Sequence, residues 1–166
     1  MGGLAQKMQA DRMKFPGMLP REILIFKTWL TQHEAEYDRF DYNFRIGAGV
    51  DPGPTWPDYV RACAIQNTQL RIDALAWKAN APTIIEVKDR AGASAVGQLA
   101  TYEAVWIKDN PQGPAPVCIL VTNRLQVNMA AVLQKSGFRC DVVQTDFSSL
   151  KPTLTSPGYT APPSGS

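Results

Sequence analysis

The chain has 166 residues, of which 45% are hydrophobic, and its formal net charge is +2. This length and content support one domain with a sizeable core and argue against two domains. The mild charge permits nucleic-acid binding without implying it, so any basic surface must come from local clustering of lysine and arginine.

The cysteines, the histidine and the apolar runs argue against a disulfide-bonded, a histidine-rich metal-binding or a membrane-spanning protein. The three cysteines include no CxxC spacing, and Cys118 sits in the apolar segment VCILV, so a disulfide framework is not expected. The single histidine, His33, cannot build a histidine-rich metal site. No apolar run approaches the roughly 18 residues of a membrane span, and the start MGGLAQKMQA lacks a signal-peptide core. We therefore expect a reducing, intracellular setting without a membrane partner.

The first third of the chain predicts an arm, a helix and a strand. Residues 1–20 hold four of the five methionines, and because methionine adapts to irregular surfaces, we expect an arm that docks on a partner, with a frayed terminus as the alternative. Apolar residues at helical spacing predict a helix over 21–37, after Pro20. Strict alternation in FDYNFRI predicts a half-buried strand over 40–46, and glycine and proline predict a loop over 47–57.

The rest of the chain alternates strands with helices and ends in a tail. Residues 147–166 are rich in proline, glycine and serine, which predicts an extended, non-globular segment. The elements before this tail follow from the period of their apolar residues. They are a short helix at 58–66, strands at 69–77 and 83–88, a helix at 92–109, a strand at 115–123, a helix at 125–138 and a strand at 140–146.

The predicted domain therefore spans residues 21–146 and has the order α-β-β-β-α-β-α-β, with the short helix at 58–66 left out of this count. The simplest packing is an α/β fold in which one mixed central sheet is flanked by helices on both faces. The β-α-β-α-β portion should contain parallel strands joined by right-handed crossovers.

The segment TIIEVKDR, residues 83–90, ends an apolar strand with charged side chains. Because side chains alternate along a strand, Glu86 and Lys88 share one face. A hairpin with Ala79 and Asn80 at its tip would place Asp73 directly opposite Glu86, with Cα atoms about 4.5–5.5 Å apart. Two carboxylates at that distance repel each other, so they raise a pKa or bind a cation.

This set of side chains suits phosphodiester chemistry. Hard divalent cations prefer oxygen ligands and accept one or two carboxylates, and a lysine can bind a phosphate oxygen. The next helix places Gln98 and Tyr102 on one face because they are four residues apart. Basic residues that would contact phosphates if they cluster at the rim of such a site are Arg71, Lys78, Arg90 and Arg124.

The pattern RIDALAW…TIIEVK…GQLATY resembles the PD-(D/E)xK nuclease superfamily, and most of all its RecB-like, Holliday-junction-resolvase-like and phage-encoded members. The resemblance covers residues 21–146 and implies a restriction-endonuclease-like core. It implies that Mg²⁺, or Mn²⁺, is held by Asp73, Glu86 and the backbone carbonyl of Val87. The other catalytic positions that it implies are Lys88, Gln98 and Tyr102.

The sequence departs from the family at one place and leaves one position open. The Pro-Asp of the family is Ile72-Asp73 here. The family also has an acid in its first helix, and Glu22 fits the placement near the helix start. Glu34 lies on the apolar stripe of the same helix and is the alternative, whereas Glu36 reads as a solvated charge.

Two functions follow as hypotheses. The resemblance implies a Mg²⁺-dependent DNA nuclease, encoded by a phage, that hydrolyses phosphodiester bonds. The alternative is a structural subunit of a phage particle, in its neck, tail or connector, built on a nuclease-like fold with or without activity. In either case we expect DNA or a homo-oligomeric or virion assembly as the partner, with residues 1–20 and 147–166 mediating assembly, and a cytoplasmic or virion-associated location.

Overall fold

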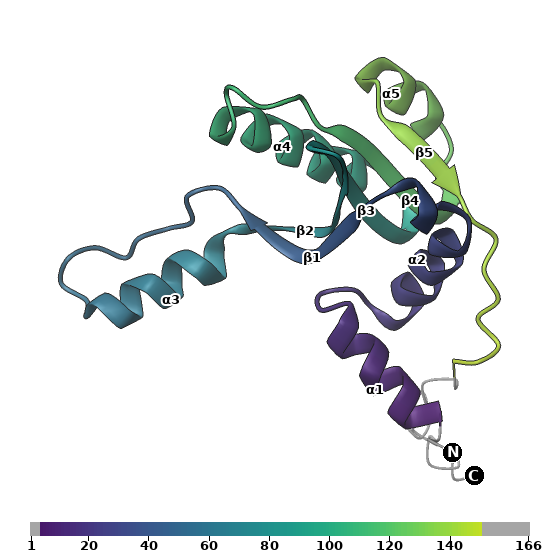
Figure 1. The fold of residues 1–166 in the computed structure, drawn as a ribbon, viewed down its shortest axis with the longest axis horizontal. Helices are drawn as coiled ribbons and strands as arrows, with labels where there is room; N and C mark the ends of the chain where they lie inside the picture. The colour runs from purple at the N-terminus through teal and green to yellow at the C-terminus, as the bar shows by residue number, and fades with distance from the viewer. Residues whose placement is uncertain (1–3, 151–166) are drawn as a thin grey trace, which may run out of the picture.

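The computed structural model describes residues 4–150 and shows a mixed α/β fold, which confirms the predicted fold class (Figure 1). A five-stranded sheet in the order β1-β2-β3-β4-β5 has helices on both faces. The helices are α1 (Leu4–Lys14), α2 (Pro20–His33), α3 (Asp58–Thr68), α4 (Ala93–Asp109) and α5 (Met129–Ser136). The strands are β1 (Arg39–Ile46), β2 (Leu70–Lys78), β3 (Ala81–Ala91), β4 (Val117–Leu125) and β5 (Arg139–Val142).

The sheet is antiparallel from β1 to β3 and parallel from β3 to β5. The β2–β3 hairpin turns at Ala79 and Asn80, as predicted, because Lys78 pairs with Ala81. Ala79 has a positive φ of 51°, and its N–H donates to Asp38 Oδ2 at 2.6 Å, which fixes the tip. Strands β3, β4 and β5 can be parallel because a helix connects each to the next, α4 between β3 and β4 and α5 between β4 and β5.

Each face of the sheet has its own hydrophobic core. Helix α2 covers one face, where Phe26 is fully buried and its ring contacts those of Phe15, Trp29, Phe40 and Tyr42 at centroid distances of 5.6 to 6.4 Å. These edge-on and stacked aromatic contacts tie α2 to β1 and to the segment after α1. Helices α4 and α5 cover the other face, so the sheet is enclosed as the fold class requires.

Several boundaries differ from the prediction for local reasons. The predicted helix over 21–37 ends at His33, and a 3₁₀ turn, Glu34–Glu36, follows it. The predicted helix at 125–138 starts only at Met129, because β4 continues to Leu125 and Asn128 adopts a φ of 70° that a helix excludes. The predicted strand at 140–146 is the shorter β5, which ends at Val142.

The two predicted assembly segments belong partly to the described region. Phe15 and Met18, at the end of the predicted arm, are buried in the α2-side core, with 1% and 6% of their surface exposed. Phe147, at the start of the predicted tail, packs against the same core. Residues 1–3 and 151–166 lie outside the described residues, so assembly through residues 1–20 and 147–166 stays a prediction.

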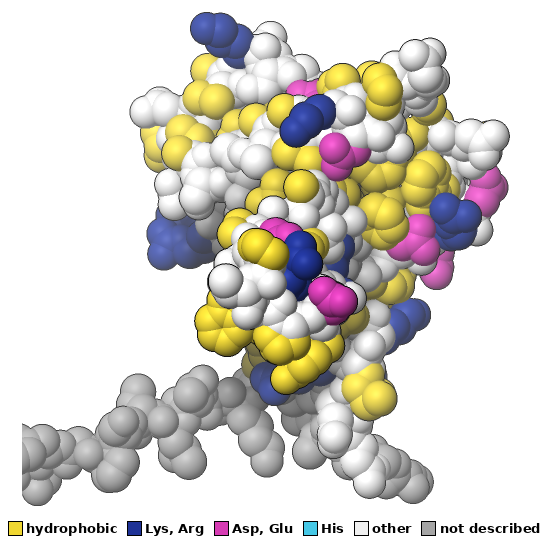
Figure 2. Space-filling view, turned by 90° about the vertical axis from the view of Figure 1, so that its left-hand side faces the viewer, with side chains coloured by type: hydrophobic (Ala, Val, Ile, Leu, Met, Phe, Trp, Pro, Cys, Tyr) yellow, Lys and Arg dark blue, Asp and Glu magenta, His cyan; other side chains and the backbone are white. Residues whose placement is uncertain are grey.

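The connection between β1 and β2 projects from the body of the molecule (Figure 1). Helix α3 has no buried residue, and Trp56 and Tyr59 expose 54% and 74% of their surface. Within this projection, Arg61 of α3 forms an ion pair with Asp51 of the preceding loop. Figure 2 faces this end of the molecule and shows hydrophobic side chains mixed with acidic and basic ones.

Within residues 4–150, no helix combines the length and the hydropathy that crossing a lipid bilayer requires.

Phe26→Ala should lower the free energy of unfolding by about 3–5 kcal/mol, because it leaves a cavity among four aromatic rings. Tyr59→Ala is the matched control, since this aromatic residue on the projection is exposed and should change stability by less than about 0.5 kcal/mol. Urea unfolding followed by circular dichroism measures both. Equal losses for the two variants would contradict the assignment of the α2-side core.

Candidate active site

The β2–β3 ladder ends where the predicted acid pair lies. The register is the predicted one, since Ala74 pairs with Ile85 and the next pair would join Asp73 to Glu86. That pair is not formed through the backbone. Instead the Val87 N–H donates to Asp73 Oδ2 at 2.9 Å, so a side chain replaces the backbone acceptor and the two strands part.

Asn43 marks the same position on the neighbouring strand. The β1–β2 ladder pairs Tyr42 with Ala74 and Phe44 with Ile72 but omits Asn43 with Asp73. Asn43 has a φ of 50°, in the left-handed region that asparagine tolerates better than most residues. Both ladders therefore break at Asp73. The sequence carries only a weak signal for this, an asparagine in the middle of a strand.

Glu86 is buried with its carboxylate unsatisfied. Only 1% of the residue is exposed, and neither Oε1 nor Oε2 accepts a hydrogen bond of acceptable geometry. Lys88 Nζ lies 2.7 Å from Oε1, so this contact is an ion pair whose angles are poor for a hydrogen bond. Burial, followed by the charge of Asp73, raises the pKa of Glu86 to about 8.

Asp73 and Glu86 act as one ionising unit. Burial raises the pKa of Asp73 to about 6, although the Val87 N–H and the charge of Lys88 oppose the rise. The negative charge of Glu22 adds to the rise. Ionising both of these neighbouring buried carboxylates is costly, so the pair favours keeping a proton or binding a cation.

Lys88 supplies the positive charge next to these acids. Its Nζ lies 2.7 Å from Glu86 Oε1 and 3.8 Å from Glu22 Oε1, and 29% of its side chain is exposed. Burial acts to lower the pKa of Lys88, but the carboxylates of Glu86, Asp73 and Glu22 outweigh it and the pKa is raised. The lysine therefore carries its proton, and in the protein alone it is a donor rather than a base.

The structure resolves which first-helix acid lies nearby. Glu22, on the first turn of α2, is 6% exposed, and its Oε2 accepts a hydrogen bond from the Leu19 N–H at 2.8 Å. This helix-capping bond leaves Oε1 directed to Lys88. Glu34 lies beyond the other end of α2, in the exposed 3₁₀ turn. Glu22 is thus brought to the site and Glu34 is not.

Gln98 and Tyr102 support the strand that carries Asp73. The Tyr102 hydroxyl donates to the Arg71 carbonyl at 2.8 Å, and Gln98 Nε2 lies 3.5 Å from the Tyr102 oxygen. Burial, followed by the charges of Glu86 and Asp73, raises the pKa of Tyr102 to about 12, so its hydroxyl keeps its proton. The contact that the structure shows is to the backbone of β2, two residues before Asp73.

The basic residues suggested for the rim divide into two groups. Arg90 and Arg124 are register partners at the ends of β3 and β4, beyond Lys88, and both are exposed. Arg71, near the start of β2, lies at the same end of the sheet. Lys78 lies at the β2–β3 turn, the opposite end of these strands. Three of the four are therefore placed near the acids.

The donor set fits a hard divalent cation. Glu86 presents two buried oxygens without hydrogen bonds, Asp73 presents a second carboxylate, and a cation would relieve the repulsion between them. Within residues 4–150, no three His, Cys, Asp or Glu side chains converge closely enough to hold a metal ion on their own. Two carboxylates agree with Mg²⁺, which keeps several waters and takes further oxygens from substrate.

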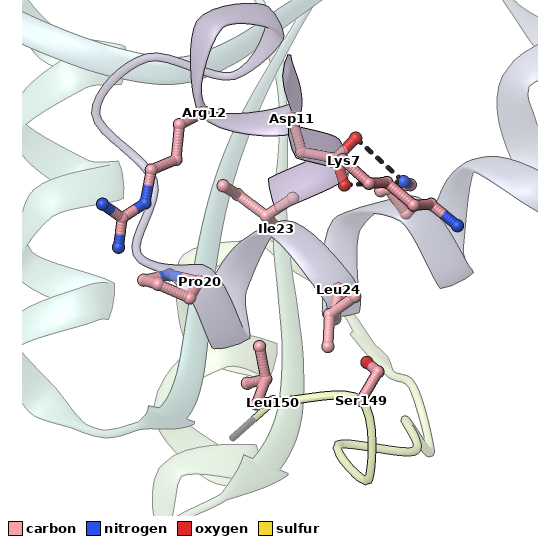
Figure 3. Close-up of a pocket in the computed structure, with 9 residues that line it drawn as sticks. Lys7, Asp11, Arg12, Pro20, Ile23, Leu24, Ser149 and Leu150 are labelled. Atoms are coloured by element: carbon pink, nitrogen blue, oxygen red, sulfur yellow. Dashed lines mark hydrogen bonds and ion pairs between the residues drawn. The ribbon is translucent and has the colours of Figure 1, made fainter. Parts of the chain in front are cut away.

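A separate cavity of about 210 Å³ lies between α1, α2 and the segment after β5 (Figure 3). Pro20, Ile23, Leu24 and Leu150 form its apolar lining, and Lys27 is bound there by Asp11 at 2.9 Å from both carboxylate oxygens. Its lining includes neither of the paired carboxylates nor the lysine beside them, so this cavity is distinct from the candidate active site.

Comparisons with known proteins leave the family open. No protein-family model matches the chain, and no curated protein matches it. Among solved structures, a repair endonuclease from Pyrococcus abyssi is 16% identical with a TM-score of 0.48, and the match covers 75% of this chain and 47% of that one. The EndoMS-dsDNA2 complex is 17% identical with a TM-score of 0.45, covering 73% and 44%. The chain spans about half the length of these proteins.

The metal-free protein should lose stability as pH rises between about pH 4 and pH 8. The reason is that the raised pKa values make the folded state keep protons that the unfolded chain has released. At pH 8, Glu86→Gln should be more stable than the wild type by on the order of 2 kcal/mol, because it removes a buried charge. Urea unfolding in EDTA across this range measures both effects.

Glu34→Gln, at an exposed acid, is the control for this pH series and should follow the wild type. A stability that does not change with pH in the wild type, or a Glu86→Gln variant that follows the same curve, would show that Asp73 and Glu86 ionise normally.

Proposed function

We propose that this chain is a metal-dependent DNA nuclease that hydrolyses phosphodiester bonds. The observation that carries the proposal is the pair of buried carboxylates, Asp73 and Glu86, at the point where β2 and β3 part, with Lys88 beside them. A buried acid pair is costly to stability and is expected where chemistry needs it. The resemblance of the surrounding sequence to PD-(D/E)xK nucleases supports the same reaction class.

Asp73 and Glu86 would hold Mg²⁺, with the Val87 carbonyl as the further ligand that the resemblance implies. The bound ion would supply Lewis-acid polarisation of the phosphodiester and a more acidic water. Mn²⁺ satisfies the same oxygen donors. The break in both ladders at Asp73 leaves the carboxylate accessible to such an ion while Val87 fixes one of its oxygens.

The remaining side chains have supporting roles in this proposal. Lys88 keeps its proton and offsets negative charge that develops on the phosphate. Glu22 holds the lysine from the α2 side through Oε1. Tyr102, with Gln98 next to it, holds the start of β2 through the Arg71 carbonyl and so sets the position of Asp73.

A structural role in a phage particle is the second candidate, and α3 is the observation that favours it. This helix buries no residue against its own domain, yet Trp56 and Tyr59 on the projection are exposed. Tryptophan and tyrosine are enriched in the surfaces through which proteins bind one another. Light scattering of the purified chain, together with the cleavage assays below, separates this role from catalysis, because an inactive chain that forms a defined oligomer would favour the structural subunit.

Asp73→Asn, Glu86→Gln and Lys88→Ala should each lower the rate of DNA cleavage with Mg²⁺ by about 100-fold or more, because each removes charge at the reacting phosphate. Gel assays on linear, circular and branched DNA measure the rate, and EDTA should abolish it. Lys78→Ala is the control for Lys88→Ala, since this exposed lysine lies at the far end of β2. No cleavage by folded wild type on any of these substrates would refute the nuclease.

Glu22→Gln should lower cleavage about tenfold while leaving the melting temperature close to that of the wild type. Glutamine can still accept the Leu19 hydrogen bond that caps α2, but it no longer attracts Lys88. Glu34→Gln is the matched control on the alternative acid and should keep full activity. The assignment of Glu22 is wrong if the two variants cleave DNA equally fast.

A further inference from the structure

Arg21 is fixed in one orientation by two contacts. Its Nε lies 2.7 Å from Asp89 Oδ2, and its Nη2 lies 3.5 Å from Asp89 Oδ1. The ring of Phe147 covers one face of the guanidinium, with its centroid 3.8 Å from Cζ. Half of the side chain, 50%, remains exposed. The arginine is therefore oriented from one edge and one face, while its remaining donors are open to solvent.

This arginine lies at the edge of the candidate active site. Arg21 directly precedes Glu22 on α2, and Asp89 directly follows Lys88 on β3. Two neighbouring ion pairs, Arg21 with Asp89 and Glu22 with Lys88, thus join the first turn of α2 to the end of β3. Arg21 is the more exposed member of the outer pair, so it forms part of the rim.

The chemistry of an oriented guanidinium matches a phosphodiester. Arginine presents five N–H donors in a planar fork, and Asp89 engages only the edge formed by Nε and Nη2. The other donors can bind a phosphate oxygen pair in the bidentate geometry that arginine favours. Because the side chain is already ordered, binding costs little additional conformational entropy.

We propose that Arg21 is a phosphate-binding residue that positions the DNA backbone beside Asp73 and Glu86. The inference rests on the proposed function and adds to it a residue that grips the substrate. Phe147 is its support, so the segment that follows β5 contributes to the substrate-binding surface.

Arg39 provides a matched control within the same chain. It too has a carboxylate partner, Asp41, at 3.4 Å and an aromatic ring, that of Trp77, at 4.7 Å. However, Arg39 pairs with Trp77 near the hairpin end of β2, away from Asp73. Each of the two arginines thus contacts one carboxylate and one aromatic ring, and they differ in where they lie relative to the candidate active site.

Binding of a short fluorescein-labelled DNA duplex, measured by anisotropy in EDTA, tests the proposal without cleavage. Arg21→Ala should weaken binding about tenfold, the loss expected for one charged hydrogen-bonded contact. The slope of log K against log salt should fall by up to about 0.9. Arg21→Lys should restore only part of the affinity, because lysine keeps the charge but not the fork. Arg39→Ala should bind like the wild type.

Steady-state cleavage with Mg²⁺ gives a second readout. Arg21→Ala should raise KM with little change in kcat, because the contact is made equally in the ground and transition states. Wild-type affinity and salt slope in Arg21→Ala, with a lower melting temperature alone, would show that Arg21 only fastens the C-terminal segment to α2. That result would overturn the inference.

The outcomes also separate this inference from the proposed function. A wild-type protein that binds DNA through Arg21 but never cleaves it would refute the nuclease and retain the phosphate-binding residue. If the wild type cleaves DNA and Arg21→Ala cleaves it with an unchanged KM, the nuclease is retained and the phosphate-binding role of Arg21 is refuted. Absence of DNA binding by the wild type would overturn the assignment of Arg21.

Discussion

The hydrogen bond from the Val87 N–H to the Asp73 carboxylate determines the geometry of the rest of the site. In an unbroken antiparallel ladder, backbone carbonyls would fill this position and the two acids would lie on a closed sheet. Here a side chain accepts the bond, so the strands separate while the Val87 N–H keeps a partner. Glu86 then lies beside Asp73 in the gap, with Lys88 two residues further along β3.

This arrangement has an energetic cost that its surroundings reduce. An unpaired buried carboxylate is strongly unfavourable, and Glu86 receives no hydrogen bond of acceptable geometry. The ammonium of Lys88 and the raised pKa of Glu86, which keeps a proton on its carboxyl, lower that cost without removing it. Burial of the hydrophobic cores on the two faces of the sheet, above all the aromatic contacts around Phe26, offsets the free energy that the unsatisfied carboxylate costs.

The sequence predicted the sheet register because local rules determine it. Alternation of side chains and a two-residue turn at Ala79 and Asn80 place Asp73 opposite Glu86 without further information. The choice between Glu22 and Glu34 was beyond such rules, because Glu22 fits the start of the helix and Glu34 fits its apolar stripe, and only the docking of α2 onto β3 separates them. Arg21 had no pattern of its own, because its partners Asp89 and Phe147 are distant in the chain.

The lengths of the strand connections have a consequence for folding. Strands β2 and β3 are joined by two residues, whereas β1 and β2 are joined through the whole projection that contains α3. Loop-closure entropy grows with the length of the connection, so the β2–β3 hairpin is the part of the sheet that forms at the least entropic cost. Asp73, Glu86 and Lys88 all lie on that hairpin. The central residues of the candidate active site thus lie on the most local strand pairing of the sheet, whereas Glu22 belongs to α2, which is distant from that hairpin in the chain.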